Sequence, residues 1–261
     1  MTASVLSITS RDNPLLGRLR KLAGDPSGYR KHGFVWIEGE HLCSAYVARG
    51  GAPVQAVVSD AAWGEPSLRT LAERAERVAV VPLALMAGLS ALESAAPIGF
   101  LVAWAAGAGL RAGAPTVVLD RLQDAGNVGN ILRSASAFGF TQVAALRGTA
   151  ALWSPKVLRA GMGAHFGLHL VESVDEAALE AIGLPLLGTS SHAALSIDQE
   201  VLPWPCAWAF GHEGQGLSNG LTARCELELR IPQPGGEESL NVASAAAVCL
   251  YESARQRSAR R

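Results

Sequence analysis

The chain has 261 residues, of which 49% are hydrophobic and 17% charged, and its formal net charge is −1 at pH 7. This length suffices for one large or two medium domains, and the balanced charge excludes strong long-range attraction of the whole molecule to a polyanion. No stretch approaches the ~18–20 apolar residues of a membrane span, and the first residues lack the basic-then-apolar order of a signal peptide. We therefore expect a cytoplasmic protein.

The first 32 residues form a basic segment in a chain of balanced charge. Asp12 as N-cap and Pro14 in the first turn indicate the start of a helix, with leucines 15, 16, 19 and 22 on one face. Such a charge run is most often a solvated face, and contact with nucleic acid is the alternative. The cations of this segment are Arg11, Arg18, Arg20, Lys21, Arg30 and Lys31.

Short apolar runs alternate with helix-like stretches in the next part of the chain. The runs are 34–37, 54–58, 78–81 and 99–104, and the helix-like stretches are 40–49, 67–76 and 83–92. This rhythm predicts a small α/β unit. A segment rich in glycine then breaks the periodicity and ends at Pro115. We therefore assign residues 1–107 to a first domain, 108–115 to a linker and 116–261 to a second domain.

The second domain is predicted to contain a parallel sheet covered by helices. Its apolar runs at 117–120, 141–146, 166–171, 184–189, 206–210 and 226–231 indicate strands. Helix-like stretches at 128–138, 154–160, 174–182 and 239–256 separate them. In such sheets ligands bind beyond the carboxyl ends of the strands, so the loops that follow strands are candidate binding regions.

The spacing of the cysteines and histidines does not favour a metal site or a disulfide. The four cysteines stand far apart, without a C-x-x-C pair, so we expect reduced and mostly buried thiols. His165 and His169 share an i, i+4 spacing without a nearby third ligand, so no metal is expected there. His212 lies in a glycine-rich turn, and turn chemistry explains it.

The loop that follows the first strand of the second domain combines two glycines with polar side chains. Gly126 and Gly129 permit close approach of a partner to the backbone, and Asn127 is a candidate helix cap. Arg133 lies away from the apolar stripe of the predicted helix. In isolation this pattern favours a solvated arginine on an exposed face.

Two later loops are equally unusual. In residues 209–218 three glycines surround Glu213, in the order G-x-x-G-x-G rather than the G-x-G-x-x-G of dinucleotide folds. Taken alone, that loop is explained equally well by a functional role and by a tight turn that carries a surface glutamate. In residues 231–248 a proline- and glycine-rich loop leads to Ser239 and Asn241 at the start of an alanine-rich helix. A helix cap would explain either Ser239 or Asn241. It does not explain the presence of both residues next to two acids at positions 237 and 238.

Together the three loops resemble, in order, the three motifs of the SpoU or TrmH family, the RNA 2′-O-ribose methyltransferases of the knotted SPOUT class. The patterns are N-x-G-x-x-x-R at 127–133, F-G-x-E-x-x-G-x-S at 210–218 and I-P-x-x-G-x-x-E-S-L-N-V at 231–242. The resemblance covers about residues 116–256. Ala125 departs from it where proline is frequent, and Ala243 where serine is common.

This resemblance implies an α/β fold in which a parallel-sheet SPOUT domain carries a C-terminal trefoil knot. The knot is expected from loops around 188–190, 209–216 and 231–240, and it would hold S-adenosylmethionine in a homodimer whose sites draw on both subunits. The implied cofactor-binding residues are Thr189, Gly211, Glu213, Ile231 and Leu240. Residues 9–14 and 35–41 are similar to the small ribosomal-protein-like α/β domain that binds the RNA substrate. The resemblance therefore favours contact between the basic segment and RNA.

The same resemblance implies a catalytic set, which comprises Arg133, Asn127, Glu213, Ser239 and Asn241. A guanidinium has a pKa above ~12 and is a poor base. We therefore expect Arg133 to stabilise the developing alkoxide and a neighbouring RNA phosphate, with the proton passing to phosphate or water. The two asparagines would orient the ribose or the arginine, Ser239 would donate a positioning hydrogen bond, and Glu213 would hold its loop or pair with a donor.

Two other classes of function stay open at this point. An NAD-dependent oxidoreductase would bind a dinucleotide in the same sheet, and a noncatalytic RNA-binding protein would keep only the basic segment. The order of the three motifs favours the methyltransferase. The residues leave open whether the RNA is ribosomal or transfer RNA, because specificity lies in RNA shape.

Overall fold

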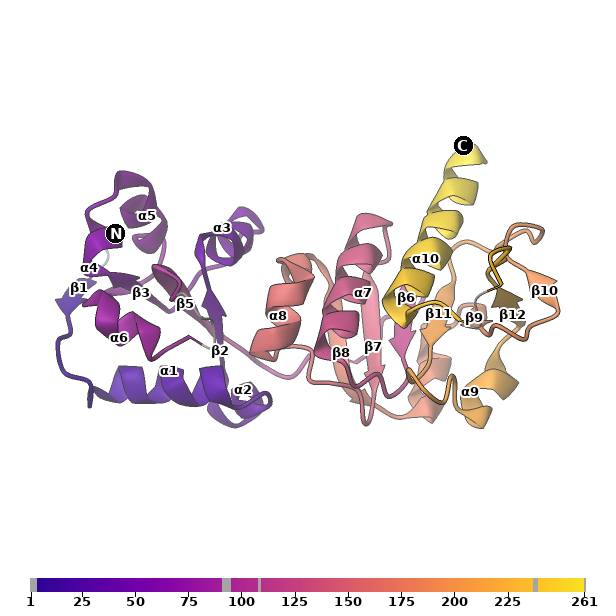
Figure 1. Ribbon diagram of the computed structural model, residues 1–261, viewed down its shortest axis with the longest axis horizontal. Helices are drawn as coiled ribbons and strands as arrows, with labels where there is room; N and C mark the ends of the chain where they lie inside the picture. Colours follow the sequence, from indigo (N-terminus) through magenta and orange to yellow (C-terminus); the bar gives the residue numbers. More distant parts are fainter. Residues whose placement is uncertain (1–3, 91–94, 108, 237–238, 261) are drawn as a thin grey trace. The chain divides into compact units, whose positions relative to one another are not determined.

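The computed structural model describes residues 4–90, 95–107, 109–236 and 239–260. The chain forms two compact units, the first from residues 1–106 and 153–166 and the second from 107–152 and 167–261 (Figure 1). The expected domain limits of 1–107, 108–115 and 116–261 stay a prediction. Within the described residues, every helix is too short or too polar to span a lipid bilayer.

The first unit is built on a five-stranded mixed sheet in the order β1-β4-β3-β5-β2. β1, β4 and β3 are parallel, whereas β5 runs antiparallel to both of its neighbours. The strands are β1 Ser4–Ser7, β2 Phe34–Glu38, β3 Gln55–Ser59, β4 Arg77–Val81 and β5 Ile98–Ala103. Its helices are α1 Pro14–Gly24, α2 Gly28–His32, α3 Glu40–Ala48, α4 Asp60–Trp63, α5 Pro66–Ala72, α6 Leu83–Ala87 and α8 Pro155–Gly161.

Helix α1 packs its leucine face into the core of this unit and leaves its cations outside. Leu16, Leu19 and Leu22 are buried in the cluster that also contains Trp36 of β2. The expected cap at position 12 is wrong, because the side chain of Asn13 accepts the hydrogen bond from the N–H of residue 15 at 2.9 Å. Asn13 therefore satisfies one of the free N–H groups of the first turn.

The second unit contains a seven-stranded parallel sheet in the order β10-β12-β9-β11-β6-β7-β8. The strands are β6 Thr116–Leu119, β7 Gln142–Leu146, β8 His169–Val174, β9 Leu186–Thr189, β10 Leu195–Ser196, β11 Ala207–Phe210 and β12 Leu227–Arg230. The helices are α7 Ala125–Ala137, α9 Asn219–Arg224 and α10 Val242–Ala259, with the 3₁₀ helix η2 Glu176–Ile182. The 3₁₀ turn η1 Ala164–Gly167 belongs to the first unit except for its last residue. The α/β fold with a parallel sheet is confirmed, and the trefoil knot stays a prediction.

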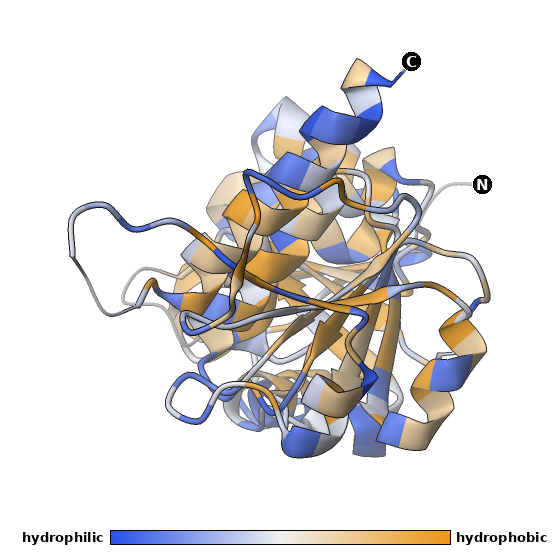
Figure 2. Cartoon of the chain, turned by 90° about the vertical axis from the view of Figure 1, so that its right-hand side faces the viewer, coloured by the Kyte–Doolittle hydropathy of each residue, from blue (hydrophilic) through white to orange (hydrophobic). Residues whose placement is uncertain are grey.

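Central strand β11 is buried on both faces of this sheet. Ala207 and Ala209 belong to the cluster that contains residues of η2 and α9. The alternate residue Trp208 donates its indole N–H to the hydroxyl of Ser253 on α10, at 2.9 Å and fully buried. Alternation along the strand thus sends successive side chains to opposite layers. Figure 2 shows mainly hydrophobic strands and hydrophilic last turns of α10.

Several short elements were not anticipated from the sequence. The strands β1 and β10 and the helices α2, α4 and α9 lack a predicted counterpart, and the stretch 174–182 forms a 3₁₀ helix. The helix expected at 83–92 ends at residue 87, and positions 91–92 lie outside the described residues. The other expected strands and helices are present with ends shifted by a few residues.

Candidate functional site

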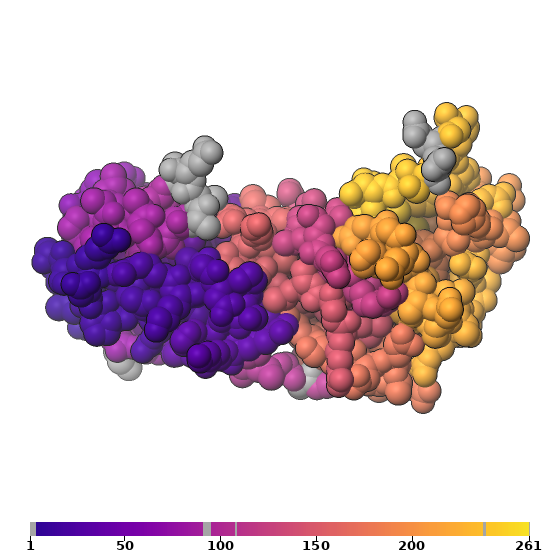
Figure 3. All heavy atoms as spheres, turned by 60° about the horizontal axis from the view of Figure 1, so that its bottom comes forward, coloured from indigo at the N-terminus to yellow at the C-terminus, as the bar shows by residue number. Residues whose placement is uncertain are grey.

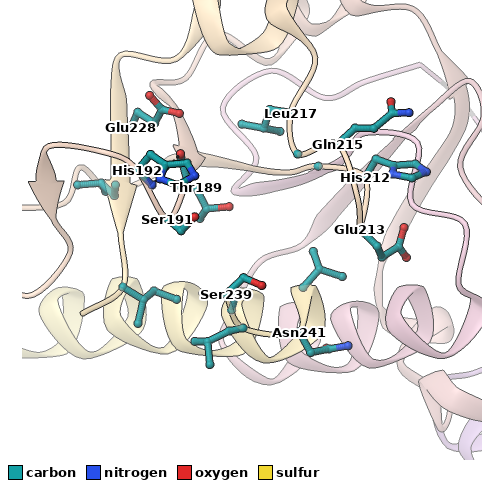
Figure 4. A pocket seen from close by; sticks show the side chains of 18 of the residues that line it. Thr189, Ser191, His192, His212, Glu213, Gln215, Leu217, Glu228, Ser239 and Asn241 are labelled. Carbon is teal, nitrogen blue, oxygen red and sulfur yellow. Dashed lines mark hydrogen bonds between the residues drawn. The ribbon is translucent and has the colours of Figure 1, made fainter. Parts of the chain in front are cut away.

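A cavity of about 650 Å³ lies at the carboxyl ends of β9, β11 and β12 in the second unit. Figure 4 shows Ser239 and Asn241 beside the first turn of α10, and Thr189, Ser191 and His192 on the opposite side. The loop 211–217 also borders the cavity. The site is therefore where ligands of parallel sheets are expected to bind.

Hydrogen bonds join all three sequence motifs at this edge of the sheet. The Nδ2 of Asn241 donates to the Oδ1 of Asn127 at 3.0 Å, and the Nδ2 of Asn127 donates to Glu213 Oε1 at 3.3 Å. Glu213 also accepts from the backbone N–H groups of residues 123 and 124, at 3.3 and 3.1 Å. Both amides are thus engaged with protein groups, which fixes the third loop to the second through the start of α7.

The carboxylate of Glu213 is held in its charged form. Burial raises its pKa, but hydrogen bonds from its own backbone N–H, from the Asn127 amide and from the N–H groups of residues 124 and 123 outweigh burial. The net result is a pKa below the ordinary value. Glu213 therefore acts as an anionic acceptor that organises the segment before α7.

Two helix caps position these side chains. Helix α7 begins one residue after Asp124, whose carboxylate accepts from the N–H of Asn127 at 2.7 Å. The expectation that Asn127 caps this helix is wrong, because Asn127 lies inside the first turn and turns its amide toward Glu213 and Asn241. Asn241 caps α10, since its Oδ1 accepts from the N–H groups of residues 243 and 244.

All five residues expected to contact the cofactor border the cavity. They are Thr189, Gly211, Glu213, Ile231 and Leu240, and Ser239 and Asn241 of the expected catalytic set join them. Gly211 is essential to this loop, because a Cβ there would overlap the backbone of residues 216 and 217. The acids 237 and 238 lie outside the described residues.

Arg133 does not border the cavity of its own chain. It is exposed on α7 two turns after Asn127, and within the described residues no hydrogen bond or ion pair holds its guanidinium. Within a single chain, three members of the expected catalytic set therefore border this cavity, Asn127 is hydrogen-bonded to two of them, and the cation lies outside.

The lining of the cavity is acidic and rich in hydroxyl groups. Glu213 and Glu228 are the carboxylates, and Thr189, Ser190, Ser191, Thr222 and Ser239 are the hydroxyl residues. Within the described part of the lining there is no lysine or arginine. His192, Gln215 and Glu228 were not anticipated as site residues. The available signals were that His192 follows an expected strand, that Glu228 lies within one, and that Gln215 lies in the glycine-rich loop 209–218.

His212 and His169 take structural positions. The Nδ1 of His212 accepts from the N–H of Gly214 at 3.0 Å, which is the turn chemistry expected for it. His169 Nε2 lies 3.0 Å from the carbonyl oxygen of Gly109. Across the described residues, no three His, Cys, Asp or Glu side chains form a cluster suited to a metal ion. The four cysteines are free thiols, and burial raises the pKa of Cys206 to about 12.

The basic residues of the first unit form a second candidate site. Arg20, Lys21 and Lys31, together with His32, border a cavity of about 370 Å³ between α1 and α2. Asp25 also borders it, but its Oδ1 accepts from the N–H and hydroxyl of residue 27. The N-terminal segment that carries these cations, indigo in Figure 3, covers much of the face of this unit seen there.

The other three expected RNA-binding residues lie outside that second cavity. The guanidinium of Arg18 lies over the ring of Phe34, 5.6 Å from its centroid, and that of Arg30 lies over Tyr29 at 5.4 Å. Arg11 is exposed, and its carbonyl accepts a hydrogen bond from Arg20.

Comparison with known proteins agrees with the site geometry. Residues 114–251 match the model of the SpoU rRNA methylase family. An uncharacterised tRNA/rRNA methyltransferase from Synechocystis is 34% identical over 98% of this chain and 96% of its own length. A 23S rRNA uridine 2′-O-methyltransferase from Streptomyces viridochromogenes is 30% identical over 98% of this chain and 94% of its own.

Solved structures extend the likeness to both units. The crystal structure of an RNA 2′-O ribose methyltransferase covers 97% of this chain and 99% of its own, with 29% identity and a TM-score of 0.81. The SpoU methyltransferase AviRb from Streptomyces viridochromogenes, in complex with AdoMet, covers 94% of this chain and 98% of its own, with 26% identity and a TM-score of 0.84. The chain belongs to the SpoU methylase family.

Proposed function

We propose that this protein transfers a methyl group from S-adenosylmethionine to a ribose 2′-hydroxyl of ribosomal RNA. The observation that carries the proposal is the cavity in which the second and third motifs meet, linked by hydrogen bonds to the first motif at Asn127. Ribosomal RNA is favoured because the full-length relative from Streptomyces viridochromogenes is named for 23S rRNA.

The side chains that line the cavity fit a positively charged cofactor. Glu213 and Glu228 supply negative charge, and the described lining lacks the lysine or arginine that would balance a pyrophosphate. Hydroxyl groups and bare backbone at Gly211 and Gly216 supply neutral hydrogen-bond partners. S-adenosylmethionine supplies an electrophilic methyl group when bound. The same charge pattern speaks against the dinucleotide of an oxidoreductase.

The chain's own side chains would divide the remaining work. Arg133 is permanently cationic, so it would stabilise negative charge on the ribose oxygen and on the adjacent phosphate. Asn127 and Asn241 would hold one another in place, because each amide already has a partner. Ser239, which borders the cavity, would donate a positioning hydrogen bond, and Glu213 would keep its loop closed.

We further propose that the active form is a homodimer, in which each site receives Arg133 from the second copy. Two features support this arrangement: Arg133 lies outside the cavity of its own chain, and α10 presents an exposed stripe at helical spacing. The stripe includes Val248 and Tyr251, which are 40% and 54% exposed. Apolar side chains at such a face are typical of a covered interface. We also propose that the loops that border the cavity, which follow β9, β11 and β12, form the trefoil knot.

Mixed dimers test this arrangement. Arg133→Ala removes the cation, and Ser191→Arg places a bulky cation in the cavity at an exposed position outside α10. Each variant alone is expected to be inactive. Unfolded and refolded together in equal amounts, they should regain about one quarter of wild-type activity, because half of the dimers keep one intact site. No recovery would contradict a site shared between copies.

The first unit is proposed to bind the RNA backbone through its basic cavity. The double variant Lys21→Ala/Lys31→Ala should weaken RNA binding and lower the slope of log K against log salt by about 1–2, since two phosphate contacts are lost. Arg49→Ala/Arg74→Ala removes two exposed cations from the same unit and serves as the matched control. Equal salt slopes for both double variants would contradict this assignment.

The reaction itself is tested with labelled S-adenosylmethionine. Ribosomal and transfer RNA are isolated separately from cells that lack the protein, and the modified nucleoside is identified by mass spectrometry. Label in a ribose of ribosomal RNA is the expected result. Label in transfer RNA instead would contradict ribosomal RNA as the substrate. Binding of RNA without transfer would favour the noncatalytic alternative. We place the protein in the cytoplasm, where both proposed substrates are present.

A further inference from the structure

Arg121 has a backbone conformation that arginine rarely adopts. Its φ of 57° lies in the left-handed region, where a Cβ is crowded and glycine or asparagine is usual. Its side chain is nevertheless fixed, because Nε and Nη2 donate to the two carboxylate oxygens of Asp120 at 2.8 and 3.2 Å. An arginine held in this conformation by its own hydrogen bonds points to a role for its side-chain contacts.

Asp120 fixes both ends of the loop 211–218. It follows β6, and its N–H donates to the carbonyl of Phe210 at 2.9 Å, where the loop begins. Its carboxylate accepts from the N–H of Ser218 at 2.7 Å, where the loop ends. Asp120 is 1% exposed, so its charge requires a partner, and Arg121 provides it.

Arg121 reaches the middle of the same loop. Its Nη1 donates to the side-chain oxygen of Gln215 at 3.3 Å, and Gln215 borders the cavity. Its backbone N–H donates to the hydroxyl of Thr149 at 3.1 Å, and that hydroxyl donates to the carbonyl of Leu119 at 2.9 Å. These contacts hold the arginine against the end of β6 while its guanidinium extends to the loop.

We propose that Arg121 is a positioning residue for the cofactor, which fixes the shape of loop 211–218 through Gln215. The inference rests on the proposed function, because it takes the cavity to be the site of S-adenosylmethionine. Arg121 does not border the cavity, so it acts on the cofactor through the loop. Loss of this contact is expected to weaken cofactor binding and raise KM, and to leave kcat at saturating cofactor almost unchanged.

A charge-balanced variant separates this role from that of a simple counterion. Asp120→Asn/Arg121→Gly removes the ion pair without leaving a buried charge, retains an oxygen for the N–H of Ser218 and relieves the left-handed strain. Ser173→Gly relieves an equal φ of 57° on β8 and is the matched control. Arg121→Lys is the second variant, since lysine keeps a positive charge for the buried Asp120 but lacks the forked donors that reach Asp120 and Gln215 together.

The dissociation constant of S-adenosylmethionine and the melting temperature are measured for each protein. The double variant should melt close to the wild type but bind the cofactor about tenfold more weakly, as a lost positioning contact predicts. Ser173→Gly should change neither quantity. Wild-type affinity in the folded double variant, or in Arg121→Lys, would overturn this inference and leave the proposed function intact. Failure of the wild-type chain to bind the cofactor would overturn the proposed function, and with it this inference.

Discussion

Replacement of Glu213 by glutamine tests how the three motifs are held together. The carboxylate accepts hydrogen bonds from the backbone N–H groups of residues 123 and 124 and from the Asn127 amide. Glutamine has the same shape but one acceptor oxygen, and its NH₂ group donates. At least one donor on α7 or on the segment before it would therefore face another donor in Glu213→Gln.

The size of the effect follows from these three bonds. Two of them are long at 3.3 Å, and the glutamate is exposed, so each contributes at the lower end of the range for bonds to a charged group. Loss of at least one of them in Glu213→Gln should cost about 1–2 kcal/mol in the ordered loop. If cofactor binding requires that loop to be ordered, affinity falls by about 5- to 30-fold.

Titration calorimetry with S-adenosylmethionine measures this change directly. Glu252→Gln is the matched control, because Glu252 also accepts several hydrogen bonds, from Arg255 and Gln256, but lies on α10 outside the cavity. The control should retain wild-type affinity. A dissociation constant of Glu213→Gln within twofold of the wild type would refute the view that this carboxylate organises the site.

Three further outcomes are expected from the described contacts. Ser253→Ala leaves the buried indole N–H of Trp208 without its acceptor, so the free energy of unfolding should fall by about 1–3 kcal/mol in chemical denaturation. Asp124→Ala removes the cap of α7 and should cost about 1 kcal/mol in the same assay, whereas Asn130→Ala on the exposed face of α7 should not destabilise the protein. The pKa of Glu213 is lowered from 4.5, so its stabilising contribution is complete above that pH and is lost as the pH falls through the lower value of the folded state. The difference in melting temperature between wild type and Glu213→Gln should therefore narrow below pH ~4.5, and a constant difference down to pH ~3 would contradict the lowered pKa.

The strands of both sheets were predictable where they are apolar and bounded by turns. β11 and β6 are buried on both faces and read as unbroken hydrophobic runs. β1 was missed because its four residues, Ser4–Ser7, are all exposed and lie at the edge of their sheet. β10 has two residues, which is too short for any periodic signal.

The cap of α7 shows a limit of inference from local sequence. Asp124 and Asn127 both favour the cap position, and sequence alone does not rank them. The choice is settled by Glu213, which is 86 residues from Asn127 in the chain and draws the asparagine amide away from the backbone. A contact of that separation cannot be inferred from spacing within one segment.

Site residues were accessible through motif order rather than through local pattern. Arg133 and Asn127 share one motif, yet only the asparagine is joined to the cavity loops of its own chain. Sequence spacing fixes positions along a helix, but it does not show which of those positions face the cavity. Asp120 and Arg121 were also missed, because their importance arises from a loop almost a hundred residues later.

The close crossing at Gly211 limits how this pocket can be redesigned. Any side chain at that position would collide with main-chain atoms of residues 216 and 217, which have no rotamer by which to yield. Enlargement for bulkier sulfonium donors must therefore come from the opposite wall, where the side chains of Ser191 and His192 border the space and are exposed. Mutational libraries directed at the glycine-rich wall should yield few folded proteins, and those directed at residues 190–192 many.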